Sequence, residues 1–138
     1  MTESRIVGGR PSLPGFYPWM VALRLGTTSR SHNCGATLIN RCWAVSAAHC
    51  FKDSTMKDHY VARVGDYFNR DVEKNQDWSV VEDVHESKLK RVIPHRDYDH
   101  SIYNNDIALI ELATCVPSFN AFRAPICLPT GKTISKNY

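Results

Sequence analysis

Short apolar runs separated by turn residues recur along the chain, and the periodicity of an amphipathic helix is almost absent. Turn-forming residues such as Pro14-Gly15, Gly26, Pro94 and Asn104-Asn105 lie between the runs. The runs that we interpret as strands are 19–25, 32–39, 43–46, 60–67, 78–85, 89–93 and 106–112. Several short strands at this spacing predict an all-β sandwich or barrel. The segment 47–51 is the exception, because its Ala-Ala pair breaks the β-branched pattern and predicts one helical turn.

Composition limits the class of protein. The 138 residues are 43% hydrophobic, which is enough for the core of one domain. No apolar run reaches the 18 or more residues of a membrane span, and the first residues do not resemble a signal peptide. The net charge of +3 does not by itself indicate a nucleic acid partner. The basic stretch Lys88-Leu89-Lys90-Arg91 alternates with apolar residues, so we interpret it as a solvated strand face, with a polyanion-binding surface as the alternative.

Five cysteines are a high number for this length, and none of them lies in a C-x-x-C pair. Zinc sites commonly take two ligands from such a pair, which makes zinc the weaker interpretation. Its candidate ligands would be His32, Cys34, His49 and Cys50. Disulfides formed in an oxidising compartment are favoured instead. The odd count leaves one thiol to pair outside these residues, so we expect a fragment of a longer secreted protein.

Four ordered motifs carry a family resemblance. They are Arg5-Ile6-Val7-Gly8-Gly9, Cys34-Gly35-Ala36-Thr37-Leu38-Ile39, Ser46-Ala47-Ala48-His49-Cys50 and Asn105-Asp106-Ile107-Ala108-Leu109. Together they resemble the amino-terminal half of a trypsin/chymotrypsin-type serine endopeptidase. Residues 42–45, 50–52 and 62–67 are most similar to neurotrypsin-like mosaic proteases.

The resemblance implies a fold and a domain organisation. The family has two perpendicular six-stranded β-barrels, and the runs listed above fit the first, an antiparallel Greek-key barrel. We therefore expect 1–5 to end a pro-segment, 6–129 to form the first barrel, and 130–138 to begin the linker to the second. The expected partners are a protein or peptide substrate, the second barrel and upstream domains of the same protein, with neither nucleic acid nor a membrane.

The resemblance also implies catalytic residues. His49 matches the general base, and an imidazole suits this task because it titrates near neutral pH. Asp106 matches the buried acid that orients the imidazole, and we expect it to be screened from water at a strand start. The plainer interpretations are a histidine capped within an alanine turn and an Asx turn after Asn104-Asn105.

The nucleophile of this chemistry is missing. No Gly-Asp-Ser-Gly-Gly turn occurs in the 138 residues. We therefore expect this chain to be inactive by itself. The alternative function is a non-catalytic, protease-like interaction module, which would have no need of both His49 and Asp106.

The resemblance also implies a cleavage site and a set of disulfides. Arg5-Ile6 resembles a zymogen activation bond. The resemblance pairs Cys34 with Cys50, and Cys42 with Cys115 as an extra bridge of the neurotrypsin-like kind. It assigns Cys127 to a bridge with the pro-segment.

One loop resembles a calcium loop of some relatives. Residues 66–77 begin with Asp66 and end near Gln76, where calcium-binding relatives carry glutamates, and Lys74 adds a positive charge. Fewer carboxylates weaken a site for a hard cation, so a solvated acidic loop is favoured. We expect no metal and no cofactor.

Overall fold

The structure is a computed structural model that describes residues 9–10, 12–26, 32–52, 55–66 and 84–131. Its strands are β1 (Met20–Leu25), β2 (His32–Leu38), β3 (Trp43–Ser46), β4 (Tyr60–Val64), β5 (His85–Pro94) and β6 (Ala108–Leu112). A 3-10 turn, η1 (Ala48–Cys50), follows β3, and a short helix, α1 (Met56–His59), precedes β4. Among the described residues, no helix is long and apolar enough to cross a membrane.

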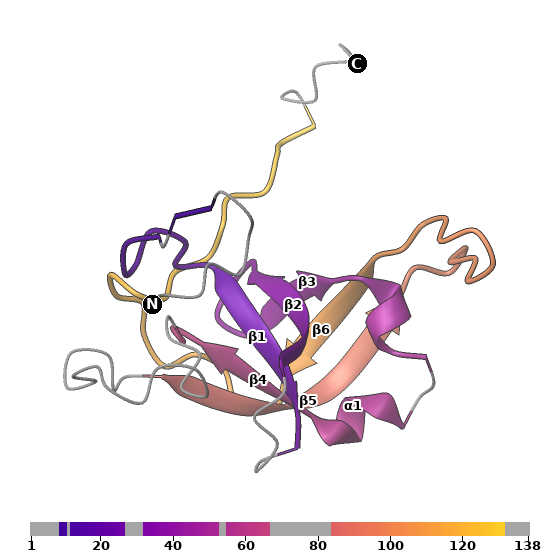
Figure 1. Cartoon of the computed structure of the whole chain (residues 1–138), viewed down its shortest axis with the longest axis horizontal. Helices are drawn as coiled ribbons and strands as arrows, with labels where there is room; N and C mark the ends of the chain where they lie inside the picture. The colour runs from indigo at the N-terminus through magenta and orange to yellow at the C-terminus, as the bar shows by residue number, and fades with distance from the viewer. Residues whose placement is uncertain (1–8, 11, 27–31, 53–54, 67–83, 132–138) are drawn as a thin grey trace.

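The six strands close into one antiparallel barrel, in the order β1-β2-β3-β6-β5-β4 with β4 returning to β1 (Figure 1). The chain forms a meander from β1 to β3 and then crosses to place β4 on the other side of β1. This arrangement of four strands is a Greek key. The predicted all-β barrel is therefore confirmed.

Alternation along each strand builds the core. In β4, Tyr60, Ala62 and Val64 point inward and are buried, whereas the residues between them are half-buried. Such alternation places every second side chain on one face of a sheet. The buried cluster consists of Val21, Leu23, Ala36, Leu38, Ala44, Tyr60, Ala62, Val64, Leu89, Ile110, Leu112 and Val116. One core thus fills the barrel.

Several predicted strand bounds are wrong. The separate runs 78–85 and 89–93 do not end and restart between residues 85 and 89, because β5 continues from His85 to Pro94 with a register irregularity. Residues 78–83 lie outside the described part of the chain. The run 60–67 ends as a strand at Val64, because Gly65 turns the backbone with a φ of 83°. The run 106–112 begins pairing only at Ala108.

Of the two short helical segments, one is predicted by the sequence and the other is not. The helical turn predicted for 47–51 is present as η1. The helix α1 is not predicted, since four residues are too few to show helical periodicity. The connection between β5 and β6 projects beyond the barrel, and η1 lies at the same end (Figure 1).

Candidate active site

The 3-10 turn η1 presents His49 to solvent between two buried neighbours. Ala48 and Cys50 are buried, whereas 47% of the His49 side chain is exposed. A disulfide joins Cys50 to Cys34 of β2. The turn that carries the imidazole is therefore covalently tied to the barrel wall.

Asp106 lies two residues before β6, at the end of the projecting connection. The preceding residue, Asn105, has a φ of 53°, a left-handed conformation that asparagine tolerates better than most residues. Its side-chain amide donates to the carbonyl of Asp97, which ties the two ends of the connection together. The Asp106 side chain is 21% exposed, so the expected screening from water is partial. The strand start alone does not cover it.

His49 and Asp106, which are 57 residues apart in sequence, meet through two hydrogen bonds. Oδ2 of Asp106 lies 2.6 Å from Nδ1 of His49, and Oδ1 accepts the backbone N–H of His49 at 2.8 Å. Since an ionised carboxylate can only accept, Nδ1 carries the proton and Nε2 is left as the basic ring nitrogen. The hydrogen bond from His49 holds the pKa of Asp106 below its ordinary value of 3.8, against the opposing effect of burial. The carboxylate is thus ionised at neutral pH.

This geometry is that of a base whose tautomer is set by an acid. A comparison of the sequence with protein families adds to this geometry. The family model for trypsin matches residues 6–137, which is nearly the whole chain. The chain belongs to the trypsin family. This family is one of serine proteases.

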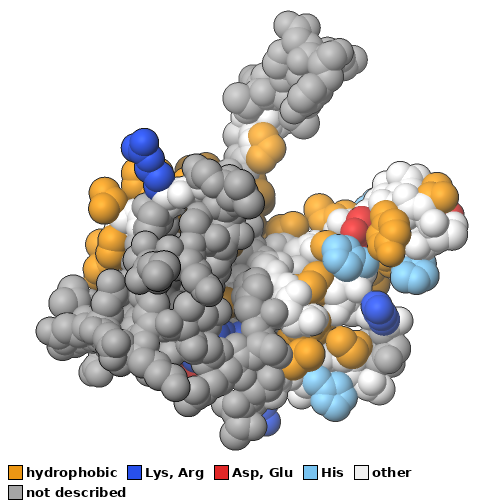
Figure 2. Space-filling view, viewed as in Figure 1, with side chains coloured by type: hydrophobic (Ala, Val, Ile, Leu, Met, Phe, Trp, Pro, Cys, Tyr) orange, Lys and Arg blue, Asp and Glu red, His pale blue; other side chains and the backbone are white. Residues whose placement is uncertain are grey.

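Figure 2 shows the face of this trypsin-family chain on which the site opens. Histidine, acidic and hydrophobic side chains gather there, where the β5–β6 connection projects on the right of the view. The ring of Tyr103 in this connection meets that of His49 edge-on, with 6.0 Å between the ring centroids. Tyr103 has a φ of 53°, which is unusual for a bulky residue. No local sequence pattern pointed to this contact.

The structure brings the expected cysteines together. Its disulfides join Cys34 to Cys50 and Cys42 to Cys115, which are the pairs that the resemblance implies. Cys127 is exposed and is the free cysteine of the described residues. Arg5 and Ile6, the expected activation bond, lie outside the described residues.

The zinc candidates do not form a site in this state. Cys34, His49 and Cys50 place ligand atoms within 4.8 Å of one another, but the two sulfur atoms are bonded to each other. Zinc binds cysteine as the thiolate, which a disulfide removes. The Nδ1 atom of His49 is also occupied by Asp106. The side chain of His32 lies outside the described residues.

Asp66, the first residue of the predicted calcium loop, already has cationic partners. Its Oδ2 lies 3.1 Å from the guanidinium of Arg24 and 3.0 Å from that of Arg63. The Asp66 side chain is nearly buried, at 5% exposed. Two guanidinium groups therefore pair with one oxygen of this carboxylate. Residues 67–77 lie outside the described part of the chain.

The basic stretch on β5 forms a solvated and internally paired surface. Lys90 and Arg91 both contact Glu111 of β6, at 3.3 and 2.9 Å. The guanidinium of Arg91 also lies over the ring of Trp43, 5.2 Å from its centroid. Glu111 thus balances one of these two positive charges, and both side chains are held by partners within the sheet, which favours the interpretation as a solvated strand face.

Proposed function

We propose that this chain forms part of the catalytic centre of a trypsin-like serine endopeptidase, in which His49 is the general base and Asp106 the orienting acid. The observation that carries the proposal is the double contact between them. One carboxylate oxygen of Asp106 sets the imidazole tautomer and the other holds the backbone of the same histidine. A histidine–aspartate pair with only a structural role would require neither a fixed tautomer of the imidazole nor a free Nε2 atom.

The proposed reaction is acyl transfer. The Nε2 atom of His49 takes the proton of a serine hydroxyl as that oxygen attacks the carbonyl carbon of a peptide bond. The imidazolium then gives this proton to the leaving amine nitrogen, and water repeats the sequence on the acyl-enzyme. Asp106 accepts the Nδ1–H throughout, and its negative charge stabilises the imidazolium without taking the proton.

The serine in this proposal comes from polypeptide outside the 138 residues, because they contain no Gly-Asp-Ser-Gly motif. We accordingly propose that the chain alone does not hydrolyse peptides. Cleavage after Arg5 would release the amino group of Ile6, as in zymogen activation within the family.

Two finer assignments belong to the same proposal. Within the family we place the chain nearest the neurotrypsin-like mosaic proteases, which the bridge between Cys42 and Cys115 supports. We also propose that the protein is secreted, with Cys127 paired to a cysteine of a pro-segment. Two disulfides in one small domain are typical of oxidising compartments.

The test begins with the transcript beyond the codon for Tyr138. The proposal expects an in-frame Gly-Asp-Ser-Gly-Gly, and the longer product should hydrolyse an arginyl peptide substrate. His49→Ala should lower kcat by about 10²- to 10⁴-fold, the usual contribution of a general base. His59→Ala is the matched control, because this histidine is exposed and belongs to α1, outside the turn and the connection that carry His49 and Asp106.

Two outcomes would contradict the proposal. If His49→Ala left the longer product fully active, the assignment of the base would be wrong. If the 138-residue chain alone turned over the substrate in a manner that needs His49, the claim of an external nucleophile would be wrong. A stop codon directly after Tyr138 would favour the interaction module instead.

A further inference from the structure

We propose that Tyr60 is a positioning residue for His49, acting through the carbonyl group of Cys50. The hydroxyl of Tyr60 holds the peptide that joins Cys50 to Phe51, one residue beyond His49, and so keeps the turn that carries the imidazole in line with Asp106. The catalytic consequence rests on the proposed function, whereas the positioning itself can be measured without catalysis.

Tyr60 reaches the histidine turn from inside the barrel. It is the first residue of β4 and is 1% exposed, so its ring belongs to the core. Its hydroxyl donates to the carbonyl oxygen of Cys50 at 3.0 Å, in a buried hydrogen bond. Its ring also meets that of Phe51 edge-on, with 5.3 Å between centroids. Tyr60 therefore contacts both residues that follow His49.

Asn33 completes the arrangement from β2. Its side-chain amide donates a hydrogen bond to the hydroxyl oxygen of Tyr60. Because that oxygen accepts from Asn33, the hydroxyl proton is directed to the carbonyl of Cys50. Asn33 is also next to Cys34, the disulfide partner of Cys50. The covalent bridge and the hydrogen bonds thus join the same two parts of the barrel.

The Cys50 carbonyl needs this partner. It lies at the end of a 3-10 turn, where carbonyl groups have no partner within the turn. A buried carbonyl without a donor is costly, so removal of the hydroxyl should loosen this end of the turn. Burial raises the pKa of Tyr60 above its usual 10, which keeps the donor proton in place. The disulfide anchors the Cys50 side chain, and the peptide that joins Cys50 to Phe51 is held at its carbonyl by the Tyr60 hydroxyl and at its N–H by the Ala48 carbonyl, at 3.0 Å.

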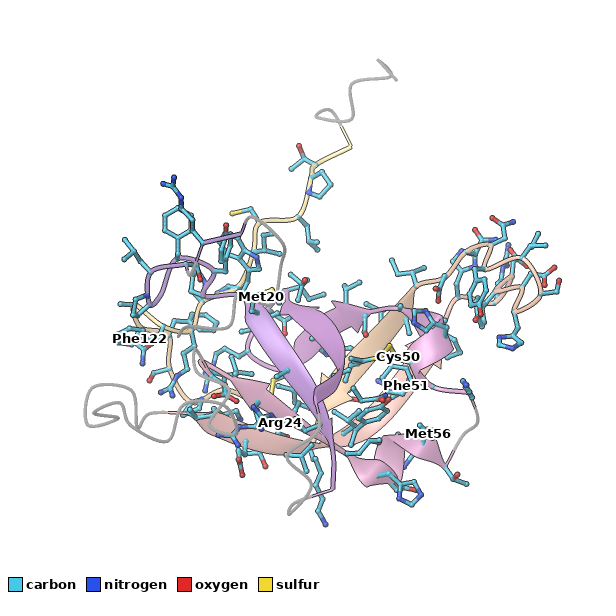
Figure 3. The ribbon with its side chains drawn as sticks, in the orientation of Figure 1. Met20, Arg24, Cys50, Phe51, Met56 and Phe122 are labelled. Atoms are coloured by element: carbon cyan, nitrogen blue, oxygen red, sulfur yellow. A yellow bond between two sulfur atoms is a disulfide. The ribbon has the colours of Figure 1, made fainter. Side chains whose placement is uncertain are left out.

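His49 is consequently held from both sides. Its own N–H is fixed by Asp106, and the carbonyl of the next residue, Cys50, is fixed by Tyr60. Figure 3 shows Cys50 and Phe51 together beside the turn, close to Met56 of α1 and away from Met20 and Phe122. A displacement of a reacting group by 1 Å can lower a rate by about 100-fold, so the position of this turn matters for catalysis.

The decisive variant is Tyr60→Phe in the oxidised 138-residue chain, because it removes the hydroxyl and keeps the ring. The readout is exchange with water of the His49 Nδ1 proton, followed by NMR at low temperature. Loss of one hydrogen bond at the turn should make this exchange about three- to tenfold faster. Asn33→Ala should change it in the same direction by about twofold, since the hydroxyl is then retained but less directed.

Ser87→Ala is the matched control. Ser87 is 5% exposed, and its hydroxyl likewise donates to a backbone carbonyl, that of Lys88 at 2.7 Å. This variant should lower the Tm but leave exchange of the His49 proton unchanged. A general loss of stability would speed exchange of the His49 proton in both variants, whereas loss of positioning would speed it only in Tyr60→Phe.

The inference is overturned if exchange in Tyr60→Phe matches that in Ser87→Ala. If Tyr60→Phe does not fold, Asn33→Ala decides, because Asn33 lies at an exposed position of β2. Unchanged exchange in that variant would equally overturn the inference. Failure of the proposed function would appear separately, as proteolysis that does not depend on His49.

Discussion

At the scale of single residues, one carboxylate performs two tasks. Asp106 accepts the ring N–H of His49 with one oxygen and the backbone N–H with the other. Orientation of the ring and position of the backbone are thereby linked to the ionised state of one side chain. Loss of its charge should affect both the chemistry and the stability of the turn.

The pH dependence of stability tests this link. The pKa of Asp106 is lowered in the folded chain from the ordinary 3.8, so its contribution is present above that value and is lost as pH falls through the folded pKa. We expect the Tm to fall below about pH 4, and to fall less steeply in Asp106→Asn. Thermal unfolding followed by circular dichroism over this range measures the slope. Asp97→Asn, at a more exposed carboxylate in the same connection, should keep the parent slope, and an unchanged slope in Asp106→Asn would refute the expectation.

At the scale of elements, the barrel is built from strands whose two faces differ. In β6, Ile110 is fully buried whereas its neighbour Leu109 is 39% exposed. Leu109 pairs with Ile93 of β5 on the outer side, and Ile110 pairs with Val92. Adjacent residues of similar size thus have opposite surroundings.

Truncation of these two neighbours should separate core packing from strand propensity. Ile110→Ala should lower the free energy of unfolding by about 3 kcal/mol, because it leaves a cavity in the core. Leu109→Ala should cost under about 1 kcal/mol, because its side chain already contacts water. Urea unfolding of both variants measures the difference. Equal losses would mean that the alternation in β6 is not as described.

The disulfides link elements at different sequence separations, which are 16 for Cys34–Cys50 and 73 for Cys42–Cys115. If closure of a longer loop restricts the unfolded chain more, removal of the second bridge should cost about 4 kcal/mol and removal of the first about 3. Paired Cys→Ser variants, compared by urea unfolding, give the order. The first bridge should matter more for the His49 turn, so exchange of its Nδ1 proton should be faster only when that bridge is removed.

At the scale of the whole molecule, the barrel encloses one core but leaves large apolar side chains outside it. They include Leu13, Phe16, Tyr17, Met20, Ile102, Tyr103 and Leu128, each more than half exposed. Leu13, Tyr17 and Met20 line one hollow together, and apolar side chains gathered on one surface favour contact with further protein. The proposal of a protease with a second barrel and upstream domains gives this surface a partner.

Thiol counting tests the covalent part of that proposal. After oxidative refolding, the denatured chain should show one free thiol, at Cys127, and Cys127→Ser should show none. A thiol reagent under denaturing conditions provides the count. Three or five free thiols in the parent chain would contradict the pairing.

The local features of this fold could be predicted from sequence, and the exact pairings could not. Alternation marked most strands, because the side-chain period of two depends only on neighbouring residues. The continuous β5 was divided wrongly, because its pairing with β4 and β6 extends through the charged residues between the apolar runs. The early end of β4 depends on the turn at Gly65.

The candidate site divides in the same way. The residue types of His49 and Asp106, and the motifs around them, determined the family and the expected chemistry. Only the closed barrel decided that both oxygens of Asp106 engage His49, that this acid remains partly exposed, and that Tyr60 binds the carbonyl of Cys50. His49 and Asp106 are 57 residues apart in sequence, and Tyr60 reaches Cys50 from a different element, so these contacts depend on strand register and barrel closure, which no local pattern specifies.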